Sequence, residues 1–311
     1  MSELNLVVFG TSILWGQGLE DGDKIHSVVV QLLRERFPER NVKATFLAHS
    51  GASTGFAQDG SVDAHREPRI HGEVPTLYPT IIQEIEEFDA LNIPSESIDI
   101  VLLDAGINDV HVTTILDPFT TPHDIEKQVE IYCHQHMELL IERLLAKFKN
   151  AKIVIVGYYE FFTEESEEEY IHTLLKAFGK LPVGPIIDAV FGVAEGLIKR
   201  RLLTNCATFS NQSRAAFEQV AADLNSRSGS QRVFVACPDI AAQHAAFASD
   251  PWLYGINDDL SPQDPVAHLR SVACISAGLL RTQPLFCEKA SAGHPNPKGA
   301  KAYAEAILAV L

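Results

Sequence analysis

Five short, mainly apolar runs recur along the chain, and segments long enough to form helices separate them. The runs cover residues 6–9, 42–48, 97–104, 152–158 and 232–236. Because consecutive parallel strands need a long crossover, usually a helix, this alternation predicts repeated strand–helix–strand units. Such units build a parallel sheet with helices on both of its faces. The spacing of the runs therefore predicts an α/β fold around one parallel sheet.

Apolar residues at helical spacing predict helices in most of the intervening segments. The expected helices cover residues 25–33, 80–91, 122–149, 211–225, 266–277 and 297–311. Pro122 and Pro297 each follow a residue suited to capping a helix, and proline is favoured in a first helical turn. The polar stretch 58–79 is too long for an ordinary connection, so it either lines a site or runs over the surface.

Residues 160–210 interrupt the strand–helix rhythm. The apolar second half of this segment contains Asp188, Glu195 and Lys199, so a membrane-crossing helix is not expected. We interpret the segment as a helical insertion that either caps the active edge of the sheet or adds a packing pair of helices. With 46% hydrophobic and 21% charged residues, the chain is expected to form one domain over residues 1–311, with this insertion.

The turn after the first apolar run, residues 6–9, carries a serine at a position suited to chemistry. Gly10 ends the run, so Thr11 and Ser12 lie at the carboxyl end of the expected strand. Ligands of open α/β sheets bind at that end. Ser12 is therefore a candidate nucleophile, and the alternative is a Gly-Thr-Ser turn that only caps a helix.

Three further turns supply the groups that a serine nucleophile needs. A serine hydroxyl is a poor nucleophile unless a base accepts its proton, and His294, just before the last helix, is the candidate base. The tetrahedral intermediate needs donors for its oxyanion, and the candidates are the Ser12 N–H, the Gly51 N–H and the Asn108 amide. Each of these residues also has a purely structural interpretation. Gly51 could only permit a turn, Asn108 could cap a turn, and His294 could be a solvated surface residue.

These turns resemble, in the same order, the four sequence blocks of the SGNH branch of the GDSL hydrolase family. The matching residues are Gly10-Thr11-Ser12 with Gly16, Gly51, Gly106-Ile107-Asn108-Asp109, and His294-Pro295-Asn296. The resemblance covers residues 4–311 apart from the insertion. It implies a three-layer α/β/α sandwich with a five-stranded parallel sheet of flavodoxin-like topology. It also implies hydrolysis of carboxylic esters or thioesters through Ser12 and His294, with no metal or organic cofactor required.

Two positions depart from the family pattern. Thr11 stands where the signature has an aspartate, which matters little because that aspartate is not the nucleophile. Ser291 stands three residues before His294, where the family places an aspartate as the third member of the triad. A neutral imidazole acting as base needs an acceptor for its Nδ1–H, and we expect the main-chain oxygen of Ser291 or of a close neighbour to supply it. The alternative acceptors are three carboxylates elsewhere in the chain: Glu288, Asp258 and Asp259.

The chain is acidic, with 41 acidic against 25 basic residues and a formal net charge of −16. Nucleic acid and anionic membrane surfaces are therefore not expected partners. No Cys-x-x-Cys or His-Glu-x-x-His pattern suggests a metal site, and the five cysteines are too scattered for a disulfide framework. Reduced thiols are expected, with Cys274 and Cys287 as the pair that would close a loop under oxidising conditions. No basic segment followed by a long apolar one opens the chain, so a cytoplasmic location is expected.

The sequence thus favours a serine esterase or lipase that acts on a small-molecule ester. The rival from another class is a ligand-binding module that keeps the fold but has lost its chemistry. Carbohydrate O-deacetylase and lysophospholipase or thioesterase activities are the alternatives within enzymes, because the fold does not select among substrates. The apolar insertion favours a lipid-like acyl chain.

Overall fold

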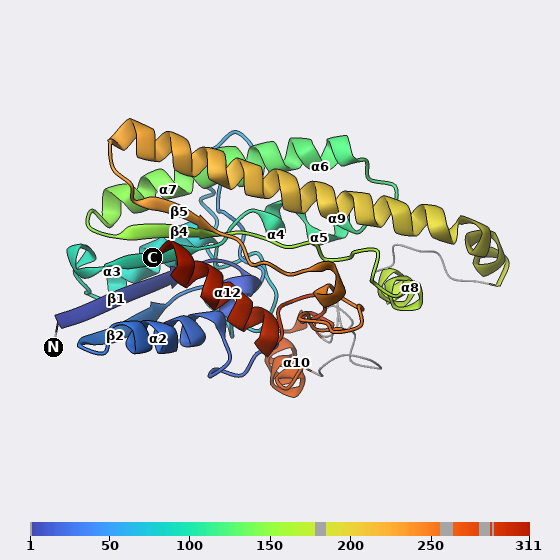
Figure 1. Cartoon of the computed structure of the whole chain (residues 1–311), viewed down its shortest axis with the longest axis horizontal. Helices are drawn as coiled ribbons and strands as arrows, with labels where there is room; N and C mark the ends of the chain where they lie inside the picture. Colours follow the sequence, from blue (N-terminus) through green and yellow to red (C-terminus); the bar gives the residue numbers. More distant parts are fainter. Residues whose placement is uncertain (1, 178–184, 256–263, 280–286, 288) are drawn as a thin grey trace.

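Five parallel strands form one sheet in the order β2-β1-β3-β4-β5, which confirms the predicted α/β fold (Figure 1). The computed structural model describes residues 2–177, 185–255, 264–279, 287 and 289–311. The strands are β1 (Ser2–Phe9), β2 (Arg40–Phe46), β3 (Ile100–Leu103), β4 (Lys152–Val156) and β5 (Val233–Ala236). This is the flavodoxin-like order, in which ligands bind outside the carboxyl ends of the strands.

Helices cover both faces of the sheet and make the fold a three-layer α/β/α sandwich (Figure 1). The longer helices are α2 (Ile25–Arg36), α3 (Ile81–Ala90), α6 (Pro122–Val129), α7 (His136–Lys147), α8 (Glu168–Ala177), α9 (Pro185–Ser228), α10 (Ala267–Ser276) and α12 (Pro297–Val310). The short ones are α1 (Ser12–Trp15), η1 (Ser95–Ser97), α4 (Ile107–Val110), α5 (Val112–Ile115) and η3 (Ala242–His244). On one face, α2 and α12 pack together and contact β2, β4 and β5, while α7 and α9 cover the other face, with α6 beside α9.

The central strands are buried on both faces because nearly all of their side chains are apolar. All four residues of β3 are buried, and so is the carboxyl-terminal half of β1, which ends at Phe9. The Phe9 ring packs against Phe88 of α3 and Phe148 at the end of α7, with centroid distances of 6.4 and 6.0 Å. Burial of each ring contributes about 2–3 kcal/mol, so this cluster anchors the strand end from which Ser12 follows.

The helix expected over residues 122–149 is present, with a wide turn in its middle. Between α6 and α7 the backbone forms a π-helical segment, η2 (Glu130–Gln135). Segments of this kind occur frequently near functional sites. Here the Cys133 sulfur lies so close to Gly106 that a β-carbon at Gly106 would come within 2.9 Å of it. The π-helical segment therefore supports the turn that carries Asn108.

The described residues between 160 and 210 are largely helical, and the last helix of this segment continues beyond residue 210. α8 follows β4, and α9 is one helix of 44 residues that continues to Ser228. The prediction of a new helix beginning at Asn211 is therefore wrong. Asn211 has a low helix propensity, but no glycine or proline interrupts residues 197–228, so the helix continues through it. Among the described residues, no helix is both long and apolar enough to span a membrane.

Candidate active site

The turn that carries Ser12 is held by two buried carboxylates from neighbouring elements. Glu84 of α3 accepts a hydrogen bond from the Gly10 N–H at 2.8 Å, and Asp104 accepts one from the Thr11 N–H at 2.8 Å. The Thr11 hydroxyl also donates to Asp104. Gly10 has a φ of +144°, and a β-carbon there would lie 2.1 Å from an Asp104 carboxylate oxygen, so only glycine fits. Ser12 therefore follows a rigid turn at the carboxyl end of β1.

Burial raises the pKa of both carboxyls that hold this turn. The pKa of Asp104 rises to about 6, because desolvation outweighs the hydrogen bonds from Thr11. The pKa of Glu84 rises well above its usual range, chiefly because the side chain is fully buried. Neither role was predicted from sequence. In the sequence, Glu84 is one of several charged residues on an amphipathic helix. Only the packing of α3 shows that the Glu84 side chain points inward.

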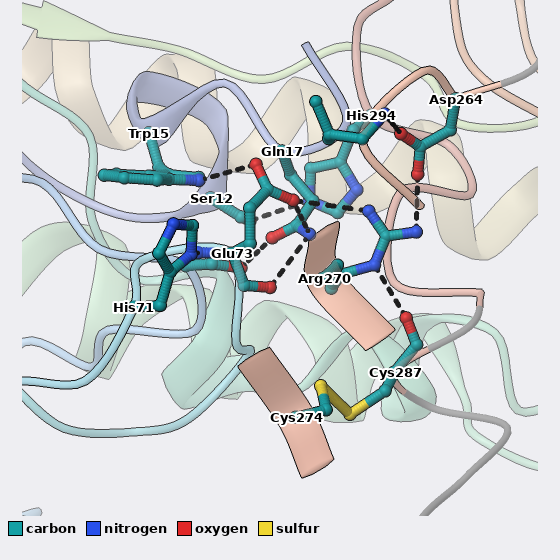
Figure 2. Close-up of polar contacts among 12 residues, drawn as sticks. Ser12, Trp15, Gln17, His71, Glu73, Asp264, Arg270, Cys274, Cys287 and His294 are labelled. Carbon is teal, nitrogen blue, oxygen red and sulfur yellow. Dashed lines mark hydrogen bonds and ion pairs between the residues drawn. A yellow bond between two sulfur atoms is a disulfide. The ribbon is translucent and has the colours of Figure 1, made fainter. Parts of the chain in front are cut away.

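His294 lies next to Ser12 and aims a ring nitrogen at it (Figure 2). His294 Nε2 and Ser12 Oγ are 2.7 Å apart, a hydrogen-bond distance. Main-chain bonds fix the histidine: its N–H donates to the Ser291 carbonyl at 2.9 Å, and its carbonyl accepts from the Tyr254 N–H at 2.7 Å. Directly behind it, Asn296 caps α12. Burial lowers the pKa of His294 to about 4, so the ring is neutral at pH 7 and able to accept a proton.

The second ring nitrogen, Nδ1 of His294, is buried and has no hydrogen-bond partner among the residues that the structure describes. The main chain of Ser291 and Ala292 still favours the protonated ring, although less strongly than burial opposes it. Two charged side chains also act on the pKa of His294: Arg270 lowers it and Asp264 raises it. Asp264 is a nearby carboxylate that sequence reasoning missed. The three alternative acceptors lie outside the described residues: Asp258, Asp259 and Glu288.

Gly51 and Asn108 lie on turns that contact each other. The Asn108 amide donates to the Ala52 carbonyl at 2.9 Å, and its second N–H has no acceptor among the residues that the structure describes. Gly51 has a φ of +85°, and a β-carbon there would lie 2.4 Å from the Thr76 carbonyl oxygen, so glycine is required. Within the described part of the chain, the N–H groups of Ser12 and Gly51 have no acceptor. These three N–H groups therefore have no acceptor among the described residues.

Part of the polar stretch 58–79 lines this edge of the sheet. The Ser50 N–H donates to the Gly72 carbonyl at 3.1 Å, which joins the stretch to the turn before Gly51. That turn is itself joined to the nucleophile turn, because the His49 N–H donates to the Gly10 carbonyl at 2.9 Å. Of the two interpretations left open for this stretch, the structure supports a lining role for its second half.

The expectation of reduced thiols is wrong for one pair, which is the pair expected to close a loop under oxidising conditions. Cys274 of α10 and Cys287 form a disulfide, with α-carbons 6.5 Å apart. The fold brings the two together because α10 packs beside the segment that leads to His294. The other three cysteines are free thiols: Cys133, Cys206 and Cys237. Among the described residues, no group of three or more histidine, cysteine, aspartate or glutamate side chains is arranged to hold a metal ion.

An apolar pocket lies beside the candidate catalytic turns. Ile13 and Ile107, the chain neighbours of Ser12 and Asn108, form part of its wall. The pocket holds about 400 Å³ of empty space, counted with the part open to solvent. Further wall residues come from the segment after β4 and from α9: Tyr158, Tyr159, Phe161, Cys206 and Phe209. α9 therefore forms one side of a cavity next to the candidate nucleophile.

Comparisons with known proteins agree with this fold. No protein-family model and no curated protein matches the chain. The extracellular lipase from Streptomyces rimosus matches over 99% of this chain and 100% of its own, at 14% identity and a TM-score of 0.56. Phospholipase A1 from Streptomyces albidoflavus NA297 matches over 99% of both chains, at 14% identity and a TM-score of 0.49. At 14% identity the match to the lipase shows a shared fold alone, and that fold is the three-layer sandwich described above.

Proposed function

We propose that the protein hydrolyses carboxylic esters, with Ser12 as the nucleophile and His294 as the general base. The observation that carries this proposal is the 2.7 Å contact between His294 Nε2 and Ser12 Oγ. A neutral imidazole at this distance can take the hydroxyl proton as the serine attacks. A module that only bound ligand would have no use for this contact. The contact therefore favours an enzyme over the non-catalytic alternative.

The proposed reaction has two steps on the same serine. Ser12 Oγ attacks the ester carbonyl carbon while His294 takes its proton, and the N–H groups of Ser12 and Gly51 and the Asn108 amide stabilise the resulting oxyanion. His294 then protonates the leaving alcohol, and an acyl-enzyme remains on Ser12. In the second step His294 deprotonates a water molecule, which attacks the acyl carbon. His294 then gives this proton to Ser12 Oγ as the bond to the acyl carbon breaks, which releases the carboxylic acid and regenerates the serine hydroxyl. We assign the orientation of the ring to the main chain of Ser291 and Ala292, which favours the protonated imidazole although neither residue hydrogen-bonds Nδ1 in this structure; the pair is then a dyad.

The proposed substrate carries an apolar acyl chain. The pocket beside Ile13 and Ile107 has aliphatic and aromatic walls, and apolar surface of a ligand is stabilised by burial in such a cavity. A lipid-like acyl ester or thioester would place methylene groups against these apolar walls. An acetyl group, as in a carbohydrate O-deacetylase, has no methylene chain to make such contacts. Cys206 and Phe209 of α9 add to this apolar wall, which supports an acyl chain as the part of the substrate that the pocket binds.

Replacement of the nucleophile tests the reaction. Ser12→Ala should lower the kcat for p-nitrophenyl butyrate by about 10⁴-fold or more, while the melting temperature stays close to that of the wild type. Ser97→Ala is the matched control, because its hydroxyl donates to the Pro94 carbonyl at 2.7 Å at the opposite end of β3. Activity of Ser12→Ala within about tenfold of wild type would refute the proposed nucleophile.

Reshaping the pocket tests the acyl chain. Ile115 lines the pocket, so Ile115→Trp should lower kcat/KM for p-nitrophenyl decanoate about tenfold relative to the acetate, by removing space for methylene groups. Ile275→Trp is the control, because this side chain is 60% exposed on α10. A chain-length profile that Ile115→Trp leaves unchanged would contradict an acyl chain in this pocket. A wild-type preference for acetate would support the deacetylase alternative instead.

A further inference from the structure

A buried arginine lies next to the candidate active site, between two carboxylates (Figure 2). The Arg270 side chain is 0% exposed. Its guanidinium contacts Asp264 at 2.5 Å and Glu73 at 3.3 Å, and both of these carboxylates are buried as well. Burial of ions costs free energy that a well-packed apolar cluster would avoid, so a buried ion pair is weak evidence for stability. The connections of Glu73 and Arg270 indicate a different role.

Glu73 binds the turn that follows the nucleophile. One carboxylate oxygen accepts from the Trp15 indole N–H at 2.9 Å, and the other accepts from the Gln17 amide at 2.8 Å. Trp15 is the last residue of α1, and the Gln17 N–H donates to the Ser12 carbonyl at 3.0 Å. Glu73 thus holds the carboxyl end of the single helical turn that presents the Ser12 hydroxyl, and the Gln17 N–H links that end to the Ser12 carbonyl.

The same network reaches the turn that carries Gly51. The oxygen of the Gln17 side-chain amide accepts a hydrogen bond from the Ser50 hydroxyl. Ser50 and Gln17 are each only 1% exposed, so this bond is shielded from water. Ser50 directly precedes Gly51, whose N–H is a candidate oxyanion donor. The position of that donor relative to Ser12 therefore depends on Gln17, and through Gln17 on Glu73.

Arg270 extends the network to the segment before His294. Its Nε donates to the Cys287 carbonyl at 2.7 Å. Cys287 is also bonded to Cys274, one turn beyond Arg270 on α10, so two links fix this point of the chain. The chain continues from Cys287 to His294. Arg270 therefore connects the anchor of the histidine segment to Glu73, which holds the serine turn.

We propose that Glu73 and Arg270 are positioning residues that hold the Ser12 turn, the Gly51 turn and the His294 segment in one fixed arrangement. This inference rests on the proposed esterase function. Neither side chain touches the reacting atoms; both act through Gln17, Ser50 and Cys287. An error of about 1 Å in the placement of catalytic groups can cost about 10²-fold in rate, so loss of either residue lowers kcat far more than it raises KM.

Three variants of the full chain test the proposal: Arg270→Met, Glu73→Gln and Gln17→Met. The readouts are kcat and KM for p-nitrophenyl butyrate and the rate constant for labelling of Ser12 by a fluorophosphonate. Each variant should lower kcat and the labelling rate together, by about 10²-fold for Arg270→Met, with KM within a few-fold. Arg270→Lys should recover part of the loss, because the ammonium retains the charge and part of the hydrogen bonding. Arg227→Met is the control, because this exposed arginine pairs with Glu138 and Glu142 far from the site.

Gln17→Met keeps the proposal testable if removal of a buried charge prevents folding, because this change leaves the ion pairs intact. The double variant Gln17→Met/Arg270→Met should lose less than the product of the single losses, since both changes disrupt one connected element. A fall in melting temperature with unchanged kcat and labelling rate in the folded variants would overturn the positioning role. Failure of the wild type to react with the fluorophosphonate would instead overturn the esterase function, so the two failures are distinguishable.

Discussion

Replacement of Asn108 by alanine separates a catalytic role of this side chain from a structural one. The amide has two N–H groups, and one of them donates to the Ala52 carbonyl at 2.9 Å. Asn108→Ala therefore removes one bond between two turns and, in our account, one donor to the oxyanion. The first loss affects the stability of the fold, and the second affects only the transition state.

The two losses have different magnitudes. Loss of an oxyanion donor lowers kcat by about 10²–10³-fold, or about 3–4 kcal/mol, with little change in KM. Loss of the bond to Ala52 costs about 1 kcal/mol of stability, which lowers the melting temperature by about 2–4 °C. Asn108→Ala should therefore show a large kinetic effect beside a small thermal one.

A matched control exists at the other end of the molecule. The Asn150 amide donates to the Glu96 carbonyl at 2.9 Å, the same kind of bond at an exposed position. Asn150→Ala should lower the melting temperature by a similar or smaller amount and leave kcat unchanged. The assay is steady-state hydrolysis of p-nitrophenyl butyrate beside thermal melts. A kcat of folded Asn108→Ala within about threefold of wild type would refute the oxyanion role.

Two further predictions concern groups beside the nucleophile and the base. Burial raises the pKa of Asp104 from 3.8 to about 6, so the folded state favours the protonated carboxyl. The free energy of unfolding of the wild type, compared with that of Asp104→Asn, should therefore fall by up to about 3 kcal/mol as the pH rises from 4 to 8. Chemical denaturation at several pH values measures this difference, and a difference that grows with pH would contradict the shift. Ser291→Ala keeps the main-chain oxygen, so kcat should stay within a few-fold, whereas loss of a true third carboxylate costs up to about 10⁴-fold. A loss of that size when Asp258, Asp259, Asp264 or Glu288 is replaced would show that the dyad is wrong.

Local patterns were sufficient to predict the sheet and the turns at its carboxyl edge. The apolar runs end where the strands end, within a few residues, because a strand buried on both faces needs continuous apolar sequence. The turns with Ser12, Gly51 and Asn108 follow strands, so the parallel topology brings them to one edge. His294 precedes a helix with a clear N-cap, which places it on a rigid turn. The contact between His294 and Ser12 spans 282 residues, and the sequence paired them through the base that a serine nucleophile needs and through the family resemblance.

The buried ion pair and the disulfide could not be predicted, because they depend on contacts between distant residues that leave no local pattern in the sequence. Arg270 and Glu73 are 197 residues apart, and each resembles an ordinary surface charge in sequence. Their burial follows from how α10 docks against Glu73, Val74 and Cys287, which no periodicity encodes. The disulfide between Cys274 and Cys287 also depends on that docking.

Covalent labelling of the folded protein by a fluorophosphonate tests the central claim most directly, because the reagent reacts with a serine that a neighbouring base activates. Our account predicts one label per chain, located on Ser12 by peptide mass, and none on Ser12→Ala. His294→Ala should slow the labelling by several orders of magnitude, since the hydroxyl then has no base. Folded wild-type protein that takes up no label, or that takes it up at another serine, would contradict the account.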